Sequence, residues 1–118
     1  MRLNHLDLHV PDVQALAAFF EQHFDFTQVS NGRSPAIAIL RGRDDFSLVI
    51  QRRRADTDVY PDGAHLGFVL PSPDDVRAHH ARMAAAGGSP GDVSVNARGT
   101  MFYTRAPGGV LVEVSSPG

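Results

Sequence analysis

The 118-residue sequence predicts an α+β fold made of two βαβββ modules in tandem. Three observations predict it. The stretch "LNHLDLHVPD" near the start and "GAHLGFVLPS" sixty residues later share a His, an apolar alternation and a following Pro. Each stretch is followed by a helical apolar pattern and then by three short β patterns. A polar segment ending in Pro and Gly separates the two copies, as is typical of a linker.

The first module is expected to span residues 1–56 and to begin with a strand. Residues 3–10 alternate between apolar and polar side chains, which indicates a strand with one buried face. The polar face of this strand would carry His5, Asp7 and His9. The first module therefore presents two imidazoles and a carboxylate on one side of its sheet.

A helix and three β segments complete the first module. Asp12 is a candidate helix N-cap, and an apolar stripe over residues 13–24 includes Phe20 and Phe24 at helical spacing. The β patterns are separated by "NGRS" and by "GRDD", which is expected to form a hairpin turn. These β patterns lie near residues 26–30, 35–41 and 46–51.

The second module, residues 64–118, repeats this order after a linker at 57–63. A strand is expected over residues 64–70. Ser72, followed by Pro73, has the residue types of a helix start, and "GG" is expected to end that helix. "APGG" is the turn expected before the last strand. The β patterns lie near residues 92–96, 101–105 and 110–115.

The composition excludes several classes of function. The chain has no Cys, so disulfides, thiolate metal sites and Cys nucleophiles are excluded. All 11 basic residues are Arg, which excludes Schiff-base chemistry on a lysine. The net charge of −2 predicts no general attraction to nucleic acid or to an anionic membrane. No apolar run reaches the roughly 18 residues of a membrane span, and a cytoplasmic location is expected.

Superposing the two modules at an offset of 60 residues pairs His5 with His65. Tandem copies of one module predict a pseudo-twofold axis, with equivalent positions facing each other across it. The two imidazoles are therefore expected to converge on one point.

The last strand of each module adds a further polar group. Gln51 lies 46 residues after His5, and Glu113 lies 48 residues after His65. Glu113 interrupts a run of Val and Leu, so its carboxylate should be partly buried and should need a partner or a cation. Two imidazoles, a carboxylate and an optional amide oxygen suit a divalent metal such as Zn, Ni, Mn or Fe.

The sequence resembles the vicinal oxygen chelate superfamily, which includes glyoxalases, bleomycin-resistance proteins and extradiol dioxygenases. The resemblance covers essentially the whole chain and rests on "LNHLDLHVPDVQALAAFFEQHFDF", "GAHLGFVLPSPDDVRAHHARMAAAGG" and "MFYTRAPGGVLVEV". It implies a cupped, half-barrel-like mixed sheet, a homodimer and a bound divalent metal. It also implies that His5, His65 and Glu113 occupy the three shared ligand positions, with Gln51 at a variable fourth. Two turns depart from the family pattern, at "APGG" and at Asp25.

Several neighbouring side chains are candidates for other roles. Asp7 and His9 share the strand face of His5 and could move a proton, hold a ligand in place, or line a polar rim. Tyr103 is a further candidate for proton transfer. Arg105 and Met101 share its strand face and could contact a substrate, or they could be ordinary sheet surface.

Two more groups of residues have simpler interpretations. His79 and His80 are neighbours on the second helix, point about 100° apart, and are predicted to lie on the surface. Arg52, Arg53 and Arg54 form a basic run, which is either solvated or part of the rim of a site for an acidic ligand.

Two functions follow from these residues. The first is a metal-dependent enzyme that chelates a small-molecule substrate through vicinal oxygens, with lyase, isomerase, transferase and oxygenase chemistry all open. The second is a protein that sequesters an antibiotic or natural product in an apolar concavity without catalysis. The intact ligand positions favour the enzyme. A fold member without present chemistry is a third alternative.

Overall fold

The computed structural model covers the 118 residues and describes residues 1–30 and 34–118. The predicted "NGRS" connection includes residues 31–33, which lie outside the described part. The chain forms two compact units, Met1–Val59 and Tyr60–Gly118, which are described one at a time. The boundary between them falls inside the predicted linker, residues 57–63. No helix in the described residues is both long and apolar enough to cross a membrane.

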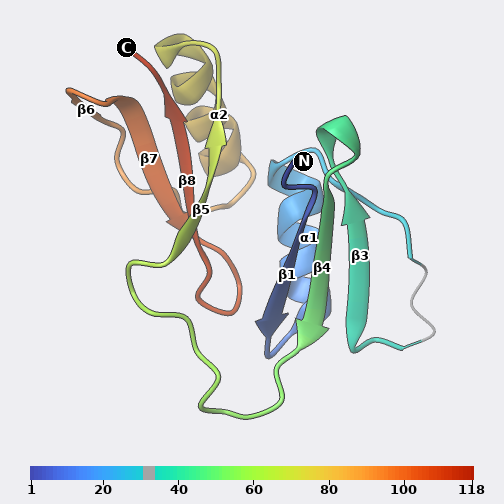
Figure 1. The fold of residues 1–118 in the computed structure, drawn as a ribbon. Helices are drawn as coiled ribbons and strands as arrows, with labels where there is room; N and C mark the ends of the chain where they lie inside the picture. The colour runs from blue at the N-terminus through green and yellow to red at the C-terminus, as the bar shows by residue number, and fades with distance from the viewer. Residues whose placement is uncertain (31–33) are drawn as a thin grey trace. The chain divides into compact units, whose positions relative to one another are not determined.

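Unit one has the predicted order of elements (Figure 1). Its four strands form one sheet in the order β1-β4-β3-β2, in which β1 and β4 run parallel and the other pairs are antiparallel. A short 3-10 turn at Arg43–Asp45 joins β3 to β4. The elements are β1 (His5–Val10), α1 (Val13–His23), β2 (Thr27–Gln28), β3 (Ile37–Arg41) and β4 (Ser47–Arg52).

Helix α1 begins and packs as its sequence pattern predicts. The Asp12 carboxylate accepts a hydrogen bond from the Ala15 amide at 3.1 Å, which satisfies one of the free N–H groups of the first turn. Leu16 and Phe20 are fully buried, and Phe24 is buried at the end of the helix. The helix therefore covers one face of the sheet, and the alternation in β1 leaves His5, Asp7 and His9 on the other.

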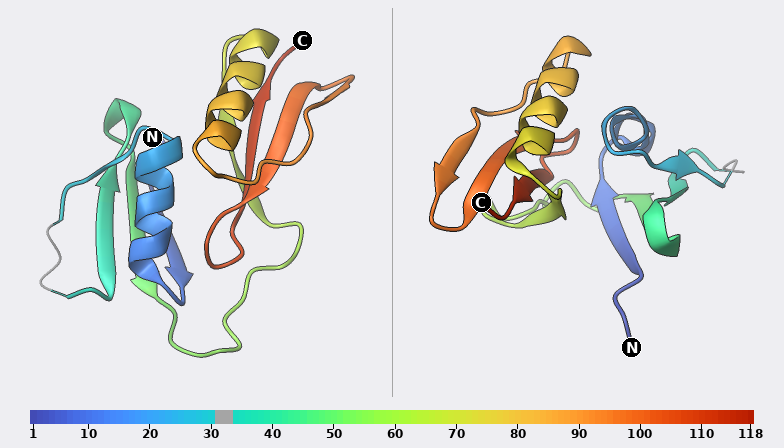
Figure 2. Two further views of the ribbon diagram at one scale, coloured as in Figure 1. Left: turned by 180° about the vertical axis from the view of Figure 1, so that it is seen from behind. Right: turned by 90° about the horizontal axis from the view of Figure 1, so that it is seen from above.

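Unit two repeats the plan with the sheet order β5-β8-β7-β6. Strands β5 and β8 are parallel, and the remaining pairs are antiparallel. Helix α2 lies against one face of this sheet, and Figure 2 shows each helix beside the sheet of its own unit. The elements are β5 (His65–Val69), α2 (Pro73–Ala85), β6 (Ser94–Asn96), β7 (Gly99–Arg105) and β8 (Leu111–Ser116). The predicted α+β class and the tandem βαβββ order are confirmed.

The predicted start and end of α2 are both confirmed. The Ser72 hydroxyl accepts a hydrogen bond from the Asp75 amide at 3.2 Å and donates one to the Asp75 carboxylate at 2.9 Å. Pro73 occupies the first turn, where its missing N–H costs nothing. Gly87 follows the helix with φ 88°, a left-handed conformation that glycine adopts without strain.

Removal of the Ser72 cap is expected to destabilise the protein by about 1 kcal/mol. Ser72→Ala leaves an N–H of the first turn without its side-chain acceptor, while Ser89→Ala changes an exposed serine beyond the helix and serves as the control. Urea unfolding followed by circular dichroism measures the difference. Equal midpoints for the two variants would show that water replaces the cap at no cost.

Two details differ from the expectations. The strand expected at 26–30 is reduced to Thr27–Gln28. "GRDD" forms a 3-10 turn in which Asp44 and Asp45 have φ values of 55° and 58°, because Asp tolerates the left-handed region better than most residues. The turn thus uses two aspartates where a hairpin usually has Asn and Gly.

The surface prediction for His79 and His80 is confirmed only in part. Both are half-buried, because their rings pack against Phe102 with centroid distances of 6.2 and 5.1 Å. His80 Nε2 also donates a hydrogen bond to the Gly91 carbonyl at 2.9 Å, and the Gly91 amide bonds to the Tyr103 carbonyl at 2.7 Å. His80 therefore joins α2 to the loop before β6.

Candidate functional site

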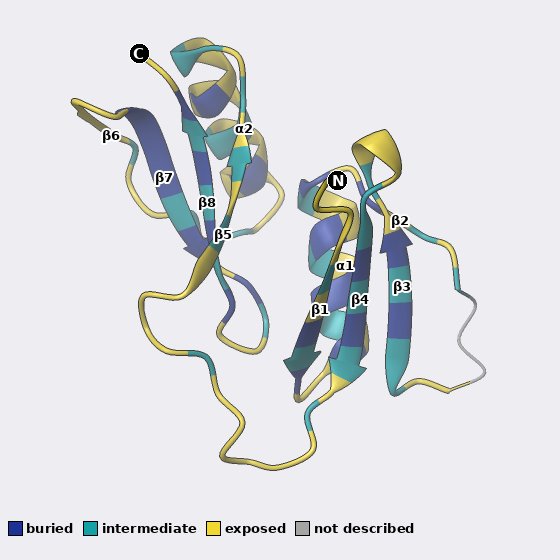
Figure 3. Cartoon of the chain, in the orientation of Figure 1, coloured by how far each residue is buried: buried dark blue, intermediate teal, exposed yellow. Residues whose placement is uncertain are grey.

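The candidate site in unit two lies on the face of the sheet opposite α2. Figure 3 shows buried and half-buried positions alternating along β8, with Glu113 at a half-buried position. Glu113 of β8 is paired in register with Gly67 of β5 on one side and with Tyr103 of β7 on the other. His65 is two residues before Gly67 and therefore shares its face. The pleat of three neighbouring strands thus gathers an imidazole, a carboxylate and a phenol.

Glu113 is partly buried and has partners, as predicted. Its side chain is 16% exposed. The Tyr103 hydroxyl donates a hydrogen bond to Oε2, and His65 Nε2 lies 3.8 Å from the same oxygen. On the other side, Gly67 has no side chain to cover Oε1. The carboxylate is therefore oriented by the phenol while one edge is left open.

The hydrogen bond of His65 determines which of its two ring nitrogens can bind a metal ion. Nδ1 lies 3.0 Å from the Gly63 carbonyl, which can only accept, so Nδ1 carries a proton and, in the neutral tautomer of the ring, Nε2 has the lone pair. His5, at the equivalent strand position of unit one, has Nδ1 2.8 Å from Asn4 Oδ1. Metal-binding histidines in proteins are commonly held in this way, by an oxygen on the ring nitrogen that does not bind the metal.

The residues of this pair fit a divalent metal. Ligand distances of about 2.0–2.2 Å in a tetrahedral site place two donor atoms roughly 3.4 Å apart, close to the 3.8 Å between His65 Nε2 and Glu113 Oε2. Within the described part of the chain, no three His, Asp or Glu side chains form a metal-binding group. The pair supplies two donors from unit two, and the third predicted ligand, His5, belongs to unit one.

The pKa of Tyr103 is raised above its usual value of 10.0. The largest cause is the hydrogen bond to Glu113, followed by desolvation and by the negative charge of that carboxylate. Arg98 acts in the opposite direction, through a hydrogen bond and its positive charge. Tyr103 therefore keeps its proton at neutral pH and donates it to the hydrogen bond with Glu113.

Alkaline titration is expected to show Tyr103 ionising above pH 10. Because the folded-state pKa is raised, the stability it contributes is present below the unfolded-state pKa and is lost as the pH rises through the folded value. Phenolate absorbance measures the titration, and Tyr103→Phe isolates this residue because the chain has two tyrosines. Glu113→Gln should lower the Tyr103 pKa, since it removes the charge. An unchanged titration in that variant would contradict the assignment.

Sequence reasoning missed Arg98. It lies in the tight connection between β6 and β7, where its amide bonds to Asn96 Oδ1 at 2.8 Å. Its guanidinium is 3.9 Å from the Met101 sulfur. Its positive charge and a hydrogen bond also lower the pKa of Tyr103, against the effect of Glu113. An arginine at a hairpin tip is usually solvated, so its position in the sequence contains no sign of this contact.

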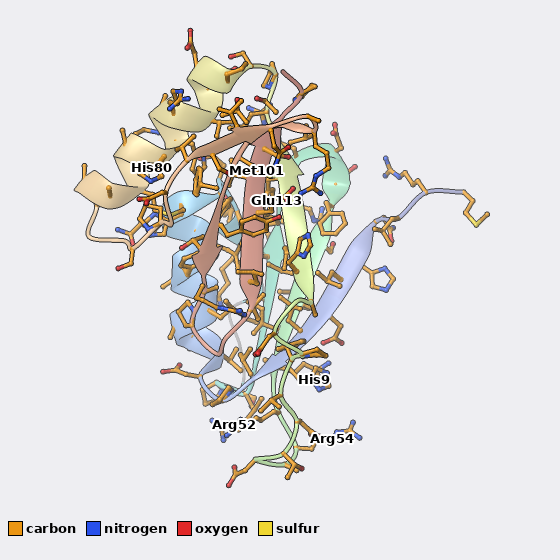
Figure 4. All side chains as sticks on the ribbon, turned by 90° about the vertical axis from the view of Figure 1, so that its left-hand side faces the viewer. His9, Arg52, Arg54, His80, Met101 and Glu113 are labelled. Atoms are coloured by element: carbon orange, nitrogen blue, oxygen red, sulfur yellow. The ribbon has the colours of Figure 1, made fainter. Side chains whose placement is uncertain are left out.

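Met101 and Arg105 were predicted as substrate contacts, and both are engaged within unit two. Met101 is 4% exposed, with the Asn96 amide and Arg98 guanidinium against its sulfur. Figure 4 shows Met101 beside Glu113. The Arg105 guanidinium donates to the Gly109 carbonyl at 2.9 Å and to the Asp62 carbonyl at 3.0 Å. Arg105 thus holds the last turn, and substrate contact by either residue stays a prediction.

In unit one, Asp7 lies between His9 and Gln51 on the face of the sheet opposite α1. Asp7 Oδ1 is 3.2 Å from His9 Nε2, and Oδ2 accepts a hydrogen bond of 2.7 Å from Gln51 Nε2. His9 and Gln51 are paired in register on the parallel strands β1 and β4. The amide holds the carboxylate, which in turn contacts the imidazole.

The register revises the equivalence between Gln51 and Glu113. Glu113 pairs with the residue two after His65, whereas the residue paired with the position two after His5 is Val49. Gln51 lies two residues further along β4. By register, Val49 is therefore the counterpart of Glu113 in unit one. The Gln51 amide donates its hydrogen bond to Asp7.

Comparison with known proteins identifies the family. The model of the Glyoxalase/Bleomycin resistance protein/Dioxygenase superfamily matches residues 2–114. The chain therefore belongs to this superfamily. No curated protein is similar enough in sequence to count as a match.

Solved structures share the fold along nearly the whole chain. A structure described as "a possible Glyoxalase from Bacillus cereus" is 33% identical, with a TM-score of 0.81 and 98% of each chain covered. Lactoylglutathione lyase from Agrobacterium tumefaciens is 17% identical, with a TM-score of 0.76, covering 98% of this chain and 92% of that one. The fosfomycin resistance protein FosX from Listeria monocytogenes is 18% identical, with a TM-score of 0.78 and coverages of 100% and 94%. At these low identities the last two establish the fold alone.

Proposed function

We propose that the chain is a metal-dependent enzyme acting on a small molecule that offers two neighbouring oxygens. The observation that carries the proposal is the pairing of His65 Nε2 with the Glu113 carboxylate, while Nδ1 is bonded to the Gly63 carbonyl. His5, held in the same way by Asn4, is the proposed third ligand. Gln51 is the proposed optional fourth ligand, because only its amide nitrogen is bonded to Asp7 and its amide oxygen can bind a metal.

When bound, a divalent ion such as Zn, Ni, Mn or Fe would supply Lewis acidity toward the substrate oxygens. The protein side chains would supply the rest. Tyr103 keeps its proton at neutral pH and can donate a hydrogen bond to a substrate oxygen that gains negative charge. The His9 imidazole, oriented by Asp7, is the proposed proton-transfer group of unit one. Lyase, isomerase, transferase and oxygenase reactions all fit this description.

The proposal is tested by the metal content of protein purified without chelator or affinity tag. Close to one Ni, Zn, Mn or Fe per chain is expected, with loss of that metal in His65→Ala. Metal-free and metal-reconstituted protein are then incubated with vicinal-oxygen compounds, such as α-hydroxy ketones, 1,2-diols and epoxides, and turnover is followed by NMR. Turnover that is equal with and without the metal would contradict the proposal.

A second function is sequestration of a drug or natural product without catalysis. The sheet face of unit one opposite α1 supports this second function, because Ile37, Ile39 and Val49 are half-buried there and form an apolar surface beside Asp7. A metal-free protein whose melting temperature rises with a bleomycin-type or aromatic drug would support this function over the first. The predicted homodimer stays a prediction, which sedimentation equilibrium tests.

A further inference from the structure

The guanidinium of Arg105 joins two loops at one end of unit two. One terminal nitrogen, Nη1, donates a hydrogen bond of 2.9 Å to the Gly109 carbonyl in the turn between β7 and β8. The other, Nη2, donates a hydrogen bond of 3.0 Å to the Asp62 carbonyl in the segment that leads into β5. Figure 1 shows β7 ending where β5 and β8 begin. We propose that Arg105 is a positioning residue, which keeps the His65 ring in the tautomer whose Nε2 can bind a metal ion.

The register of the sheet places Arg105 and His65 in one row. Both residues pair with Leu111 of β8, Arg105 from the antiparallel strand β7 and His65 from the parallel strand β5. They are therefore two strands apart, about 10 Å between backbones, on the face that also carries Glu113. Because its hydrogen bonds reach the segments before β8 and before β5, the Arg105 side chain links one end of this row to the other.

The segment that Arg105 holds also carries the carbonyl that bonds to His65. The Asp62 carbonyl is followed along the chain by the Gly63 carbonyl, which lies 3.0 Å from His65 Nδ1. A backbone hydrogen bond of 3.0 Å closes residues 61–64 into a tight turn, so the two carbonyls move together. Gly63 has no side chain with which to hold this turn, and a Cβ built there would meet no atom within 4 Å. The Arg105 hydrogen bond therefore fixes the position of the acceptor that His65 uses.

The His65 ring needs a fixed acceptor on Nδ1 because its other nitrogen faces a stronger one. A carboxylate accepts a hydrogen bond more strongly than a backbone carbonyl does, and Nε2 lies 3.8 Å from Glu113 Oε2. When the Gly63 carbonyl moves away, the neutral ring is expected to place its proton on Nε2, toward Glu113. That tautomer leaves no lone pair on Nε2 for a metal ion. The His65 side chain is 41% exposed, so packing does not prevent the change.

A guanidinium suits this role because its N–H groups form a rigid, planar fork. Both terminal nitrogens of Arg105 bind backbone carbonyls, so a single plane holds the turn before β8 and the turn before β5 in one arrangement. The consequence for metal binding rests on the proposed function. The tautomer of His65 does not, because it is a property of the metal-free protein.

The test is the tautomer of His65 in the metal-free, 15N-labelled full chain, read from long-range 1H–15N NMR spectra at pH 9, where neutral imidazole is observed. The wild type should show mainly the Nδ1–H form. Arg105→Gln should raise the ratio of the Nε2–H form to the Nδ1–H form at least about threefold, the size expected for a weakened hydrogen bond. An unchanged ratio in Arg105→Gln, or an Nε2–H ring in the wild type, would overturn the inference.

Two controls belong to the same spectra. Arg77→Gln makes the same exchange at an exposed position of α2 and should leave the His65 ratio at its wild-type value. The ring of His5 belongs to unit one and should keep its tautomer in every variant. An equal change of the His65 ratio in Arg77→Gln would show that Arg105 has no special role.

A measurement on the wild type covers the case in which Arg105→Gln folds poorly. The terminal N–H groups of Arg105 should give separate NMR signals, because two hydrogen bonds restrict rotation of the guanidinium, whereas those of Arg77 should be averaged. Averaged signals for Arg105 would overturn the inference.

Titration with Zn²⁺ separates this inference from the proposed function. In Arg105→Gln, the affinity for Zn²⁺ should fall by the same factor as the fraction of the Nδ1–H form, because only that form is competent to bind. A wild-type protein that binds no Zn²⁺ would contradict the proposed metal site, while the tautomer change would still establish that Arg105 positions His65.

Discussion

Exchange of Glu113 for Gln is expected to lower the affinity for a divalent metal by more than about 100-fold, because changes to residues that only support a ligand already cost about 10–100-fold. The amide matches the carboxylate in shape but carries no charge, and it binds divalent cations more weakly. The loss should be largest for Zn and Ni, for which the His65 imidazole is a good partner. Calorimetric titration of metal-free protein measures the affinity.

The control for this experiment is Ser115→Ala. Ser115 lies two residues after Glu113 on the same face of β8. The Ser115→Ala variant therefore changes a side chain beside Glu113 and leaves the carboxylate itself unchanged. Circular dichroism should show that both variants keep the fold, since Glu113 is outside the core between α2 and the sheet. A metal affinity that is equal in wild type and Glu113→Gln would remove Glu113 from the ligand set.

The Gly99→Ala variant is expected to lose at least about 3 kcal/mol of stability, and unit two should be largely unfolded under mild conditions. Gly99 begins β7 with φ 133°, a conformation that residues with a Cβ rarely adopt. A Cβ built there would lie 2.0 Å from the Ser116 carbonyl oxygen and 3.0 Å from the Ser116 carbonyl carbon. Both atoms are backbone, so the clash cannot be relieved by turning a side chain.

Gly63→Ala is the matched control for Gly99→Ala. A Cβ at Gly63 meets no atom within 4 Å, so this exchange should change stability by less than about 1 kcal/mol. Urea midpoints of the two variants measure the difference. If Gly99→Ala unfolds at the wild-type midpoint, the approach of β7 to Ser116 is looser than the structure shows.

The fold could be predicted from the sequence because its elements are specified locally. The alternation in residues 5–10, the N-caps Asp12 and Ser72 and the glycine at 87 are all short-range patterns, and the structure confirms each one. The partly buried carboxylate of Glu113 was predictable for the same reason, since a single acid in a run of Val and Leu needs a partner.

The site was less predictable because register is not a local property. Counting residues from His5 and from His65 gave similar spacings for Gln51 and Glu113, and the sheets show a difference of two positions. The same limit explains Arg98, whose contacts with Met101 and Tyr103 depend on how a hairpin folds back. Arg105 has the residue type of a ligand contact, but it holds the backbone of a turn instead.

The two sheets also differ in the strand that holds the acid. At the equivalent pair of positions, unit one has Asp7 on its first strand opposite Val49, and unit two has Gly67 on its first strand opposite Glu113. If both halves descend from one duplicated ancestor, the carboxylate has moved to the neighbouring strand in one of them. Because each half has its own hydrophobic core, such an exchange could become established in one copy while the other copy preserved the ancestral chemistry.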